Sequence, residues 1–232
     1  MCIRDRKYVK YVADKKAKSL IICGPPGMSK TYIVRRVFHF KGLTPGKDYW
    51  IAKGSSLGII EAYTLFYKNR DRIIVLDDFD TPLRNEDMIN MLKAITDSYS
   101  KRVLALPREI LISSGEGGTE EQGVPEQFEF RGHLIIITNI EKKHIDRALL
   151  SRSPTIEVNF NTKEILEALQ SLMKFINPDI HMEMKKEVYN YILELKKNSK
   201  IHLDFRGFKS AIEVRYCVPE HWKEMTKIIV NF

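Results

Sequence analysis

The sequence contains few cysteines and no long hydrophobic run. Its three cysteines, Cys2, Cys23 and Cys217, lie far apart in 232 residues, which argues against a disulfide framework. No apolar stretch approaches the roughly 20 residues of a membrane-spanning helix, and the start of the chain has no apolar signal core. The six histidines show no metal-ligand spacing. We therefore expect a soluble cytosolic protein without membrane contact.

Basic residues exceed acidic ones, and the excess is concentrated at the start of the chain. The formal net charge is +8. Residues 1–18 hold seven Lys/Arg and two Asp, which gives 7 − 2 = +5 and leaves +3 for the other 214 residues. Such a segment either contacts nucleic acid or forms an ordinary solvated helix face, and both interpretations stay open.

A phosphate-binding loop is predicted where the apolar run Leu20–Cys23 ends. The next eight residues read Gly-Pro-Pro-Gly-Met-Ser-Lys-Thr, which is a Gly/Pro-rich turn followed by Lys-Thr at a helix start. Glycine lets the backbone approach a phosphate, and the N-terminal end of the helix adds positive potential. Lys30 is suited to the β- and γ-phosphates and Thr31 to Mg²⁺. The predicted binding residues are Gly24, Pro25, Pro26, Gly27, Met28, Ser29, Lys30 and Thr31.

Ser29 departs from the usual form of this loop, because the position before the lysine is commonly glycine. A Cβ atom is tolerated there if the residue has helical backbone angles, and otherwise it weakens binding.

A second element supports the loop. Residues 73–80 read Ile-Ile-Val-Leu-Asp-Asp-Phe-Asp, which predicts a buried parallel strand with carboxylates at its C-terminal end. Ligands bind at that edge of open α/β sheets. We expect Asp77 to hold Mg²⁺ and Asp78 to orient or deprotonate the attacking water.

Two further motifs follow. The run Leu134–Thr138 predicts a buried strand that ends at Asn139, whose amide is suited to holding the lytic water. Arg147 and Arg152 then flank a short helical turn. One of them is a candidate arginine finger, which acts on a neighbouring subunit's γ-phosphate; Arg152 is preferred over Arg147.

Strands and helices are predicted to alternate through the first 160 residues. The expected strands are 20–23, 49–52, 73–76, 134–138 and 155–158, and the expected helices are 5–18, 29–40, 57–67 and 85–97. The apolar sides of the first two helices include Tyr8, Val9, Tyr11 and Val12, and Tyr32, Ile33, Val37 and Phe40. This alternation predicts an α/β fold with a five-stranded parallel sheet between helices.

Residues 101–133 are predicted to be a β-hairpin-like insertion. Short strands are expected at 103–106, 110–112 and 128–130, around a flexible polar loop. Lys101, Arg102 and Arg108 form a basic group in it. Beyond residue 160 the pattern is helical, at 163–176, 182–197, 205–215 and 220–230. The predicted domains are therefore a core at 1–160 and a small helical lid at 161–232.

The order of these elements resembles the AAA+ ATPase family. The matching motifs are GPPGMSKT (Walker A), IIVLDDFD (Walker B), IIITN (sensor one) and ALLSRS (arginine finger). The segment DFRGFKSAIEVR resembles the sensor-two helix, which implies that Arg206 faces the nucleotide. Walker B usually ends in Asp-Glu, and the shorter Asp78 implies slower hydrolysis. The Asp-Asp pair and the hairpin also resemble superfamily 3 viral helicases, and the combination resembles AAA-type ATPases encoded by tailed bacteriophages.

The resemblance implies an ATPase that binds ATP and Mg²⁺ between subunits of a homo-oligomer, a ring or spiral for which a hexamer is one candidate size. Its expected action is remodelling or translocation of DNA, as in a helicase, helicase loader or clamp loader. The expected location is the cytoplasm, and the phage resemblance adds the option of a viral protein in a bacterial host. Two alternatives stay open: an ATPase that remodels a protein partner, and a nucleotide-dependent switch or scaffold with slow turnover.

Overall fold

Five parallel strands form the central sheet in a computed structural model of the chain, which describes residues 3–55, 57–106, 124–198 and 201–230, with side chains from residue 6 onward. The strand order is β2-β3-β6-β1-β7. Each predicted strand is present to within one residue, so the predicted sheet is confirmed. The strands are β1 (Ser19–Cys23), β2 (Tyr49–Lys53), β3 (Ile73–Asp77), β6 (His133–Thr138) and β7 (Thr155–Glu157).

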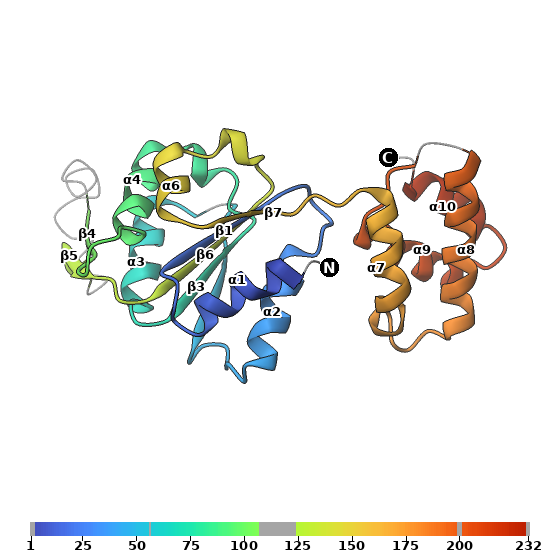
Figure 1. The fold of residues 1–232 in the computed structure, drawn as a ribbon, viewed down its shortest axis with the longest axis horizontal. Coiled ribbons are helices and arrows are strands. Elements are labelled where there is room, and N and C mark those ends of the chain that lie inside the picture. Colours follow the sequence, from blue (N-terminus) through green and yellow to red (C-terminus); the bar gives the residue numbers. More distant parts are fainter. Residues whose placement is uncertain (1–2, 56, 107–123, 199–200, 231–232) are drawn as a thin grey trace. The chain divides into compact units, whose positions relative to one another are not determined.

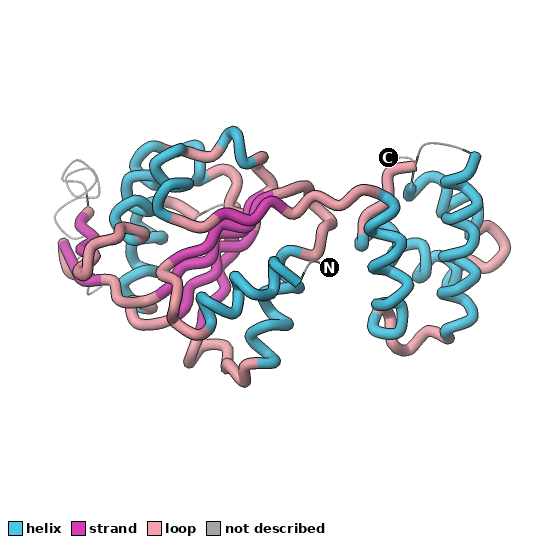
Figure 2. The backbone as a smooth tube through the Cα atoms, viewed as in Figure 1, coloured by secondary structure: helices cyan, strands magenta, loops and turns pink. Residues whose placement is uncertain are grey.

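Helices cover both faces of this sheet (Figures 1 and 2). One face carries α1 (Ile3–Ala13) and α2 (Lys30–Phe40), which pack against each other. The other face carries α3 (Ile59–Lys68), α4 (Glu86–Ile95) and α6 (Arg147–Arg152). Short 3-10 turns lie at Pro82–Arg84 and Lys142–His144. No helix in the described ranges is long and apolar enough to cross a membrane.

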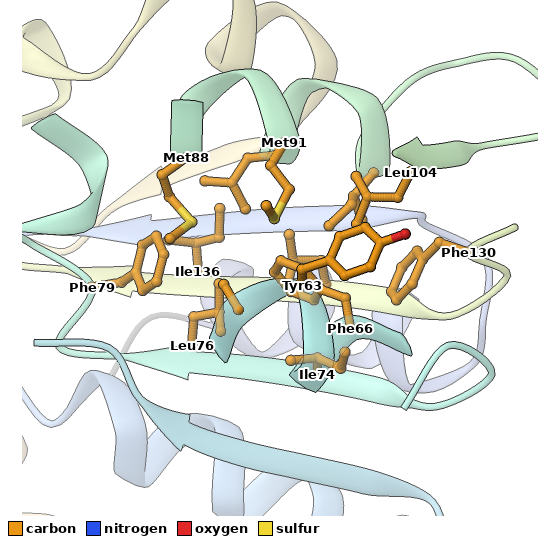
Figure 3. Close-up of a cluster of buried hydrophobic side chains, with 14 of the residues drawn as sticks. Tyr63, Phe66, Ile74, Leu76, Phe79, Met88, Met91, Leu104, Phe130 and Ile136 are labelled. Carbon is orange, nitrogen blue, oxygen red and sulfur yellow. The ribbon is translucent and has the colours of Figure 1, made fainter. Parts of the chain in front are cut away.

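The apolar core follows from the alternation of side chains along each strand. Ile74, Leu76 and Ile136 point to the face covered by α3 and α4, where they pack with Tyr63, Phe66 and Met88 (Figure 3). Their sequence neighbours, such as Val75 and Ile137, are equally buried. Both faces of the sheet are therefore buried from solvent, which explains why the strands consist almost entirely of aliphatic residues.

Local signals explain two helix ends. The Asn85 side chain accepts a hydrogen bond from the Met88 amide at 2.9 Å and caps α4, as an asparagine before an amphipathic run predicts. The first helix ends at Ala13 instead of the expected residue 18. Lys15 has a φ of 57°, in the left-handed region, and the chain turns there toward β1.

Four aromatic side chains predicted on the apolar sides of α1 and α2 are exposed instead. Tyr8, Tyr11, Tyr32 and Phe40 are 39%, 50%, 43% and 70% exposed, whereas their valine and isoleucine neighbours are buried. A narrow stripe of smaller residues is enough to cover the sheet. The four rings lie at the margins of the buried sides of the two helices, so their side chains point toward solvent.

The predicted hairpin is present where the described residues reach it. Strands β4 (Val103–Ala105) and β5 (Gln127–Glu129) pair antiparallel, with Leu104 opposite Phe128. Phe128 packs edge-on against Tyr63, with ring centroids 5.1 Å apart. The hairpin base is thus anchored on α3. The expected strand at 110–112 and most of the polar loop lie outside the described residues.

Arg102 is buried, so its predicted place in an exposed basic group is wrong. Its guanidinium donates to the carbonyl oxygens of Ile95 and Gly132 at 2.9 and 2.8 Å and lies over the Phe130 ring. Burial lowers the pKa of Arg102. These contacts link the end of α4 to the turn just before β6, so Arg102 is a structural residue. Arg108 lies outside the described residues.

The described chain divides into two compact units, and the smaller one contains Asn159 onward together with Pro26–Ser29. Its helices confirm the expected helical C-terminal region. They are α7 (Thr162–Leu172), a 3-10 turn (Met173–Phe175), α8 (Met182–Asn198), α9 (Phe205–Cys217) and α10 (Trp222–Val230). The side chains of Asn161 and Glu164 form a capping box at α7. Whether the two units act as a core and a lid stays a prediction.

Candidate nucleotide-binding site

The glycines of the predicted loop occupy positions that other residues do not fit. Gly24 follows β1 with a φ of 143°, and a Cβ atom there would collide with the Val158 carbonyl. Gly27 has a φ of 76°, and a Cβ atom there would collide with the Asp204 carboxylate within the smaller unit. Pro26, between them, is exposed, and Met28 is buried. The loop therefore needs both glycines for its shape.

Lys30 lies at the base of this loop with its ammonium group held by three oxygen atoms. Nζ donates to the carbonyl oxygens of Gly24 and Pro25 at 2.6 and 2.7 Å and to Asn139 Oδ1 at 2.8 Å. Burial lowers the pKa of Lys30, and nearby carboxylates, Asp80 first, oppose that shift. The loop thus holds a largely desolvated cation, with 6% of the residue exposed, at the edge of the sheet.

Ser29 has a φ of 58°, so the condition for tolerating a Cβ atom there is not met. A left-handed non-glycine residue costs about 1–2 kcal/mol, which glycine avoids at the expense of about 0.5–1 kcal/mol of chain entropy. The glycine usual at this position therefore fits the backbone better than the serine present.

We expect Ser29→Gly to raise the free energy of unfolding by about 1 kcal/mol, because it removes the left-handed strain. Urea unfolding followed by circular dichroism measures this change. Ser55→Gly is the matched control, since exposed Ser55 does not have a positive φ, and there glycine should be neutral or destabilising. Equal effects of the two substitutions would contradict a strained backbone at Ser29.

Thr31 and Asp77 meet across the sheet edge. Thr31 Oγ1 donates to Asp77 Oδ1 at 2.6 Å, although the residues come from α2 and β3. Mg²⁺ prefers oxygen ligands and is commonly held by one or two carboxylates with substrate phosphates. A hydroxyl and a carboxylate beside a phosphate-type loop fit this chemistry. The described residues hold no cluster of three His, Cys, Asp or Glu that would form an all-protein metal site.

Asp78 occupies a left-handed position directly after β3, with a φ of 54°. Its carboxylate is exposed, while the next residue, Phe79, turns back into the core with its amide donating to the Ile137 carbonyl at 2.9 Å. Aspartate tolerates left-handed angles better than glutamate. The shorter acid that departs from the usual Walker B motif therefore suits the backbone found here.

Asp80 is a site residue that the sequence analysis did not select. Its carboxylate accepts hydrogen bonds from Thr138 Oγ1, the Asn139 amide and Asn139 Nδ2 at 2.6, 2.7 and 2.8 Å. Burial alone would raise the pKa of Asp80, but these hydrogen bonds lower it. Asp80 thus orients Asn139, whose Oδ1 faces Lys30. The sequence signal that could have identified Asp80 is its place as the last acid of the segment Asp77–Asp80.

We expect Asp80→Ala to lower the free energy of unfolding by about 1–3 kcal/mol at neutral pH, because it leaves part-buried donors of Thr138 and Asn139 unpaired. The folded-state pKa of Asp80 lies below its unfolded value. Its contribution is therefore present above the unfolded pKa and lost as the pH falls through the folded one. Urea unfolding between about pH 3 and 7 should show a smaller loss of stability for the variant than for the wild type. Parallel curves would contradict this role.

In the described part of the larger unit, neither Arg152 nor Arg147 makes a hydrogen bond or ion pair with these residues. Arg152, at the end of α6, donates to the Ala148 carbonyl at 3.0 Å, and its Nε lies 3.9 Å from Asp97 Oδ2. Arg147, at the start of α6, is exposed. Arg206 is exposed in the first turn of α9, in the smaller unit. Their roles toward a nucleotide stay predictions.

The motifs converge because β6 lies between β1 and β3, so that the ends of three neighbouring strands meet at one edge. The fold is the predicted α/β fold, with a five-stranded parallel sheet between helices. The segments that resemble AAA+ motifs before β7 follow or adjoin these strands, as that resemblance implies. No protein-family model matches the chain.

One curated relative is an uncharacterized 36.7 kDa protein from the nrdC-mobD intergenic region of Enterobacteria phage T4. It is 28% identical over 165 residues, which cover 66% of this chain and 48% of the relative. The chain therefore spans about half the length of that protein.

Two solved structures are also similar. The Thermotoga maritima RuvB Holliday junction branch migration motor has a TM-score of 0.46 and 11% identity, over 97% of this chain and 60% of that one. The FIGL-1 AAA domain in complex with ADP has a TM-score of 0.48 and 12% identity, over 99% of this chain and 82% of that one.

Proposed function

We propose that this chain is an AAA+-type ATPase that binds ATP and Mg²⁺ at the described edge of the sheet and hydrolyses ATP. The supporting observation is that Lys30, Asn139 and the Thr31–Asp77 pair meet beside a loop whose two glycines have φ values of 143° and 76°. A buried cation and a hydroxyl–carboxylate pair at a helix start suit a polyphosphate with its metal.

Each residue has a distinct role in this proposal. Lys30 exchanges neutral carbonyl partners for charged phosphate oxygens, and Thr31 and Asp77 hold Mg²⁺. Bound Mg²⁺ supplies a Lewis acid that neutralises charge on the phosphates. Asp78 accepts the proton of the attacking water, and Asn139 positions that water with the amide hydrogen not given to Asp80.

We further propose that the ATPase works as a homo-oligomeric ring or spiral, for which a hexamer is the candidate size. Arg152 would reach the neighbouring subunit's site and Arg206 the nucleotide, with residues 1–160 as the core and 161–232 as a lid that moves on hydrolysis. The proposed action is remodelling or translocation of DNA, because the excess of positive charge lies at the start of the chain. The T4 relative supports a phage-encoded protein acting in a bacterial cytoplasm.

A switch with slow turnover is the second candidate, and the contacts of Asn139 favour it. The side-chain oxygen of Asn139 is engaged by Lys30 and one amide hydrogen by Asp80, which leaves a single hydrogen for the lytic water. The short side chain of Asp78 favours slow hydrolysis as well.

ATP hydrolysis with and without single-stranded DNA, together with ATP calorimetry, separates these functions. Turnover stimulated by DNA supports the DNA motor, and turnover indifferent to DNA supports a protein-remodelling ATPase. Tight binding without turnover supports the switch. No heat of binding at millimolar ATP and Mg²⁺ would remove all three.

A further inference from the structure

The outward sides of α1 and α2 form one accessible surface that the proposed nucleotide site does not use. The two helices pack against each other on the same face of the sheet (Figure 1). Val9, Val12, Ile33 and Val37 are buried, so the remaining sides of both helices are turned away from the core. We call this the α1–α2 surface.

This surface belongs to a strongly basic part of the chain. Residues 3–41 contain eleven lysines and arginines against two acids, Asp5 and Asp14. The carboxylate of Asp14 is paired with the ammonium group of Lys41, and that contact lowers the pKa of Asp14. Six basic side chains of the two helices and the turn after α1 are exposed: Arg6, Lys7, Lys10, Lys15, Lys16 and Arg35. The surface therefore suits a polyanion.

Aromatic rings stand among these charges. On α2 the guanidinium carbon of Arg36 lies 5.9 Å from the Tyr32 ring centre and 5.2 Å from the Phe40 ring centre, and Nη1 donates to the Tyr32 hydroxyl at 2.7 Å. The i, i+4, i+8 spacing makes a continuous Tyr–Arg–Phe row. On α1, Tyr8 and Tyr11 meet edge-on with ring centres 6.4 Å apart.

The combination of exposed aromatic rings and excess positive charge indicates which class of polyanion this surface would bind. A polyanion with unpaired bases offers both phosphates for the lysines and flat faces for the rings. A duplex keeps its bases stacked and offers only phosphates, and an acidic peptide offers no such faces.

We propose that the α1–α2 surface binds single-stranded DNA, with the basic residues contacting phosphates and the aromatic rings stacking on bases. This inference rests on the proposed DNA-remodelling function and names the surface that it uses. Helix α2 starts with Lys30 and Thr31 and ends with Phe40. The same rigid element thus carries the phosphate-site residues at one end and DNA-contacting rings along its length.

The test measures binding of fluorescent oligo-deoxythymidine by anisotropy without nucleotide, so it does not depend on ATP hydrolysis. Tyr11→Ala and Phe40→Ala should each weaken binding about tenfold, within the range for loss of one base stack. Lys7→Glu with Lys10→Glu should lower the slope of log affinity against log salt by about 1.4, for two lost phosphate contacts. These four residues are exposed, so the variants should fold.

Matched controls change the same residue types elsewhere. Tyr99→Ala removes a ring that is 75% exposed beyond α4, and Lys68→Glu reverses an exposed charge on α3, across the sheet. Both should bind the oligonucleotide like the wild type. Basal ATP hydrolysis of the surface variants should also match the wild type, because none of their residues belongs to the nucleotide site.

Four results would overturn the inference: wild-type binding by the surface variants, equal affinity for a blunt duplex of the same length, tighter binding of oligo-uridine, or loss of self-association in the surface variants without loss of DNA binding. The last would make the surface an interface between copies. Failure of ATP to bind would remove the proposed ATPase but leave the DNA measurement standing. The two failures are therefore distinguishable.

Discussion

Lys30→Ala should weaken ATP binding about 10- to 150-fold, because it removes charged hydrogen bonds worth about 1.5–3 kcal/mol. Hydrolysis should fall at least about 100-fold, since the same cation would stabilise charge that develops on the phosphates. The structural reason is the position of Nζ, which lies within 2.8 Å of Gly24, Pro25 and Asn139 oxygens and is almost fully buried. Calorimetry and a phosphate-release assay measure the two effects separately.

Two controls accompany this variant. Lys30→Met keeps most of the buried side chain and should lose ATP binding in the same way, so a folding defect of the alanine variant does not decide the result. Lys68→Ala removes an exposed lysine from α3 and should behave like the wild type. Unchanged turnover in either Lys30 variant would mean that the proposed site is not the site of hydrolysis.

Arg152→Ala should leave ATP binding intact and reduce hydrolysis about 1,000-fold or more, the effect typical of an arginine finger. Asp78→Ala should also abolish hydrolysis, but through the site of its own subunit. Mixing the two inactive variants should restore roughly a quarter of wild-type activity, since random assortment joins an intact Asp78 to an intact Arg152 at that share of interfaces. Phosphate release from the mixture at several ratios measures the rescue.

The matching experiment with Arg147→Ala tests the other candidate finger. Arg147 starts the same short helix and is exposed, so it controls for loss of a positive charge on α6. Rescue by Asp78→Ala confined to the Arg147 variant would transfer the role to that residue. No rescue with either variant would place both arginines outside a shared active site.

Much of the fold could be predicted from the sequence because the sheet is buried on both faces. Strands such as Ile73–Asp77 read as uninterrupted aliphatic runs, and Asn85 marks a helix start by a side chain that caps it. The meeting of Lys30 with Asn139 and of Thr31 with Asp77 could be predicted as well, because the carboxyl ends of neighbouring parallel strands lie at one edge of a sheet.

The direction of side chains at the margin of a helix could not be predicted. Tyr32 and Phe40 share a helical side with buried isoleucine and valine, and apolar periodicity alone groups them together. Which rings are exposed depends on how wide a side of the helix packs against the sheet. The same limit applies to Arg102, whose burial depends on carbonyl partners at Ile95 and Gly132.

The backbone angles of single residues could not be predicted either. In the sequence, Ser29 stands where the phosphate-binding loop usually has glycine, and Asp78 stands where Walker B usually has glutamate. The structure places both in the left-handed region, where they have opposite consequences: serine is strained, and aspartate is better tolerated than the acid it replaces.

The positions of the strands along the chain and the composition of the loop after β1 could be predicted from the sequence alone, because hydrophobic runs and glycine spacing are local properties of the chain. The pairing of Asp80 with Asn139, the grip of Asn139 on Lys30 and the outward turn of the aromatic rings were decided only by the tertiary structure. The two polar contacts depend on groups far apart in the sequence, which come together when β1, β3 and β6 pair. The direction of the rings depends on which sides of α1 and α2 pack against the sheet.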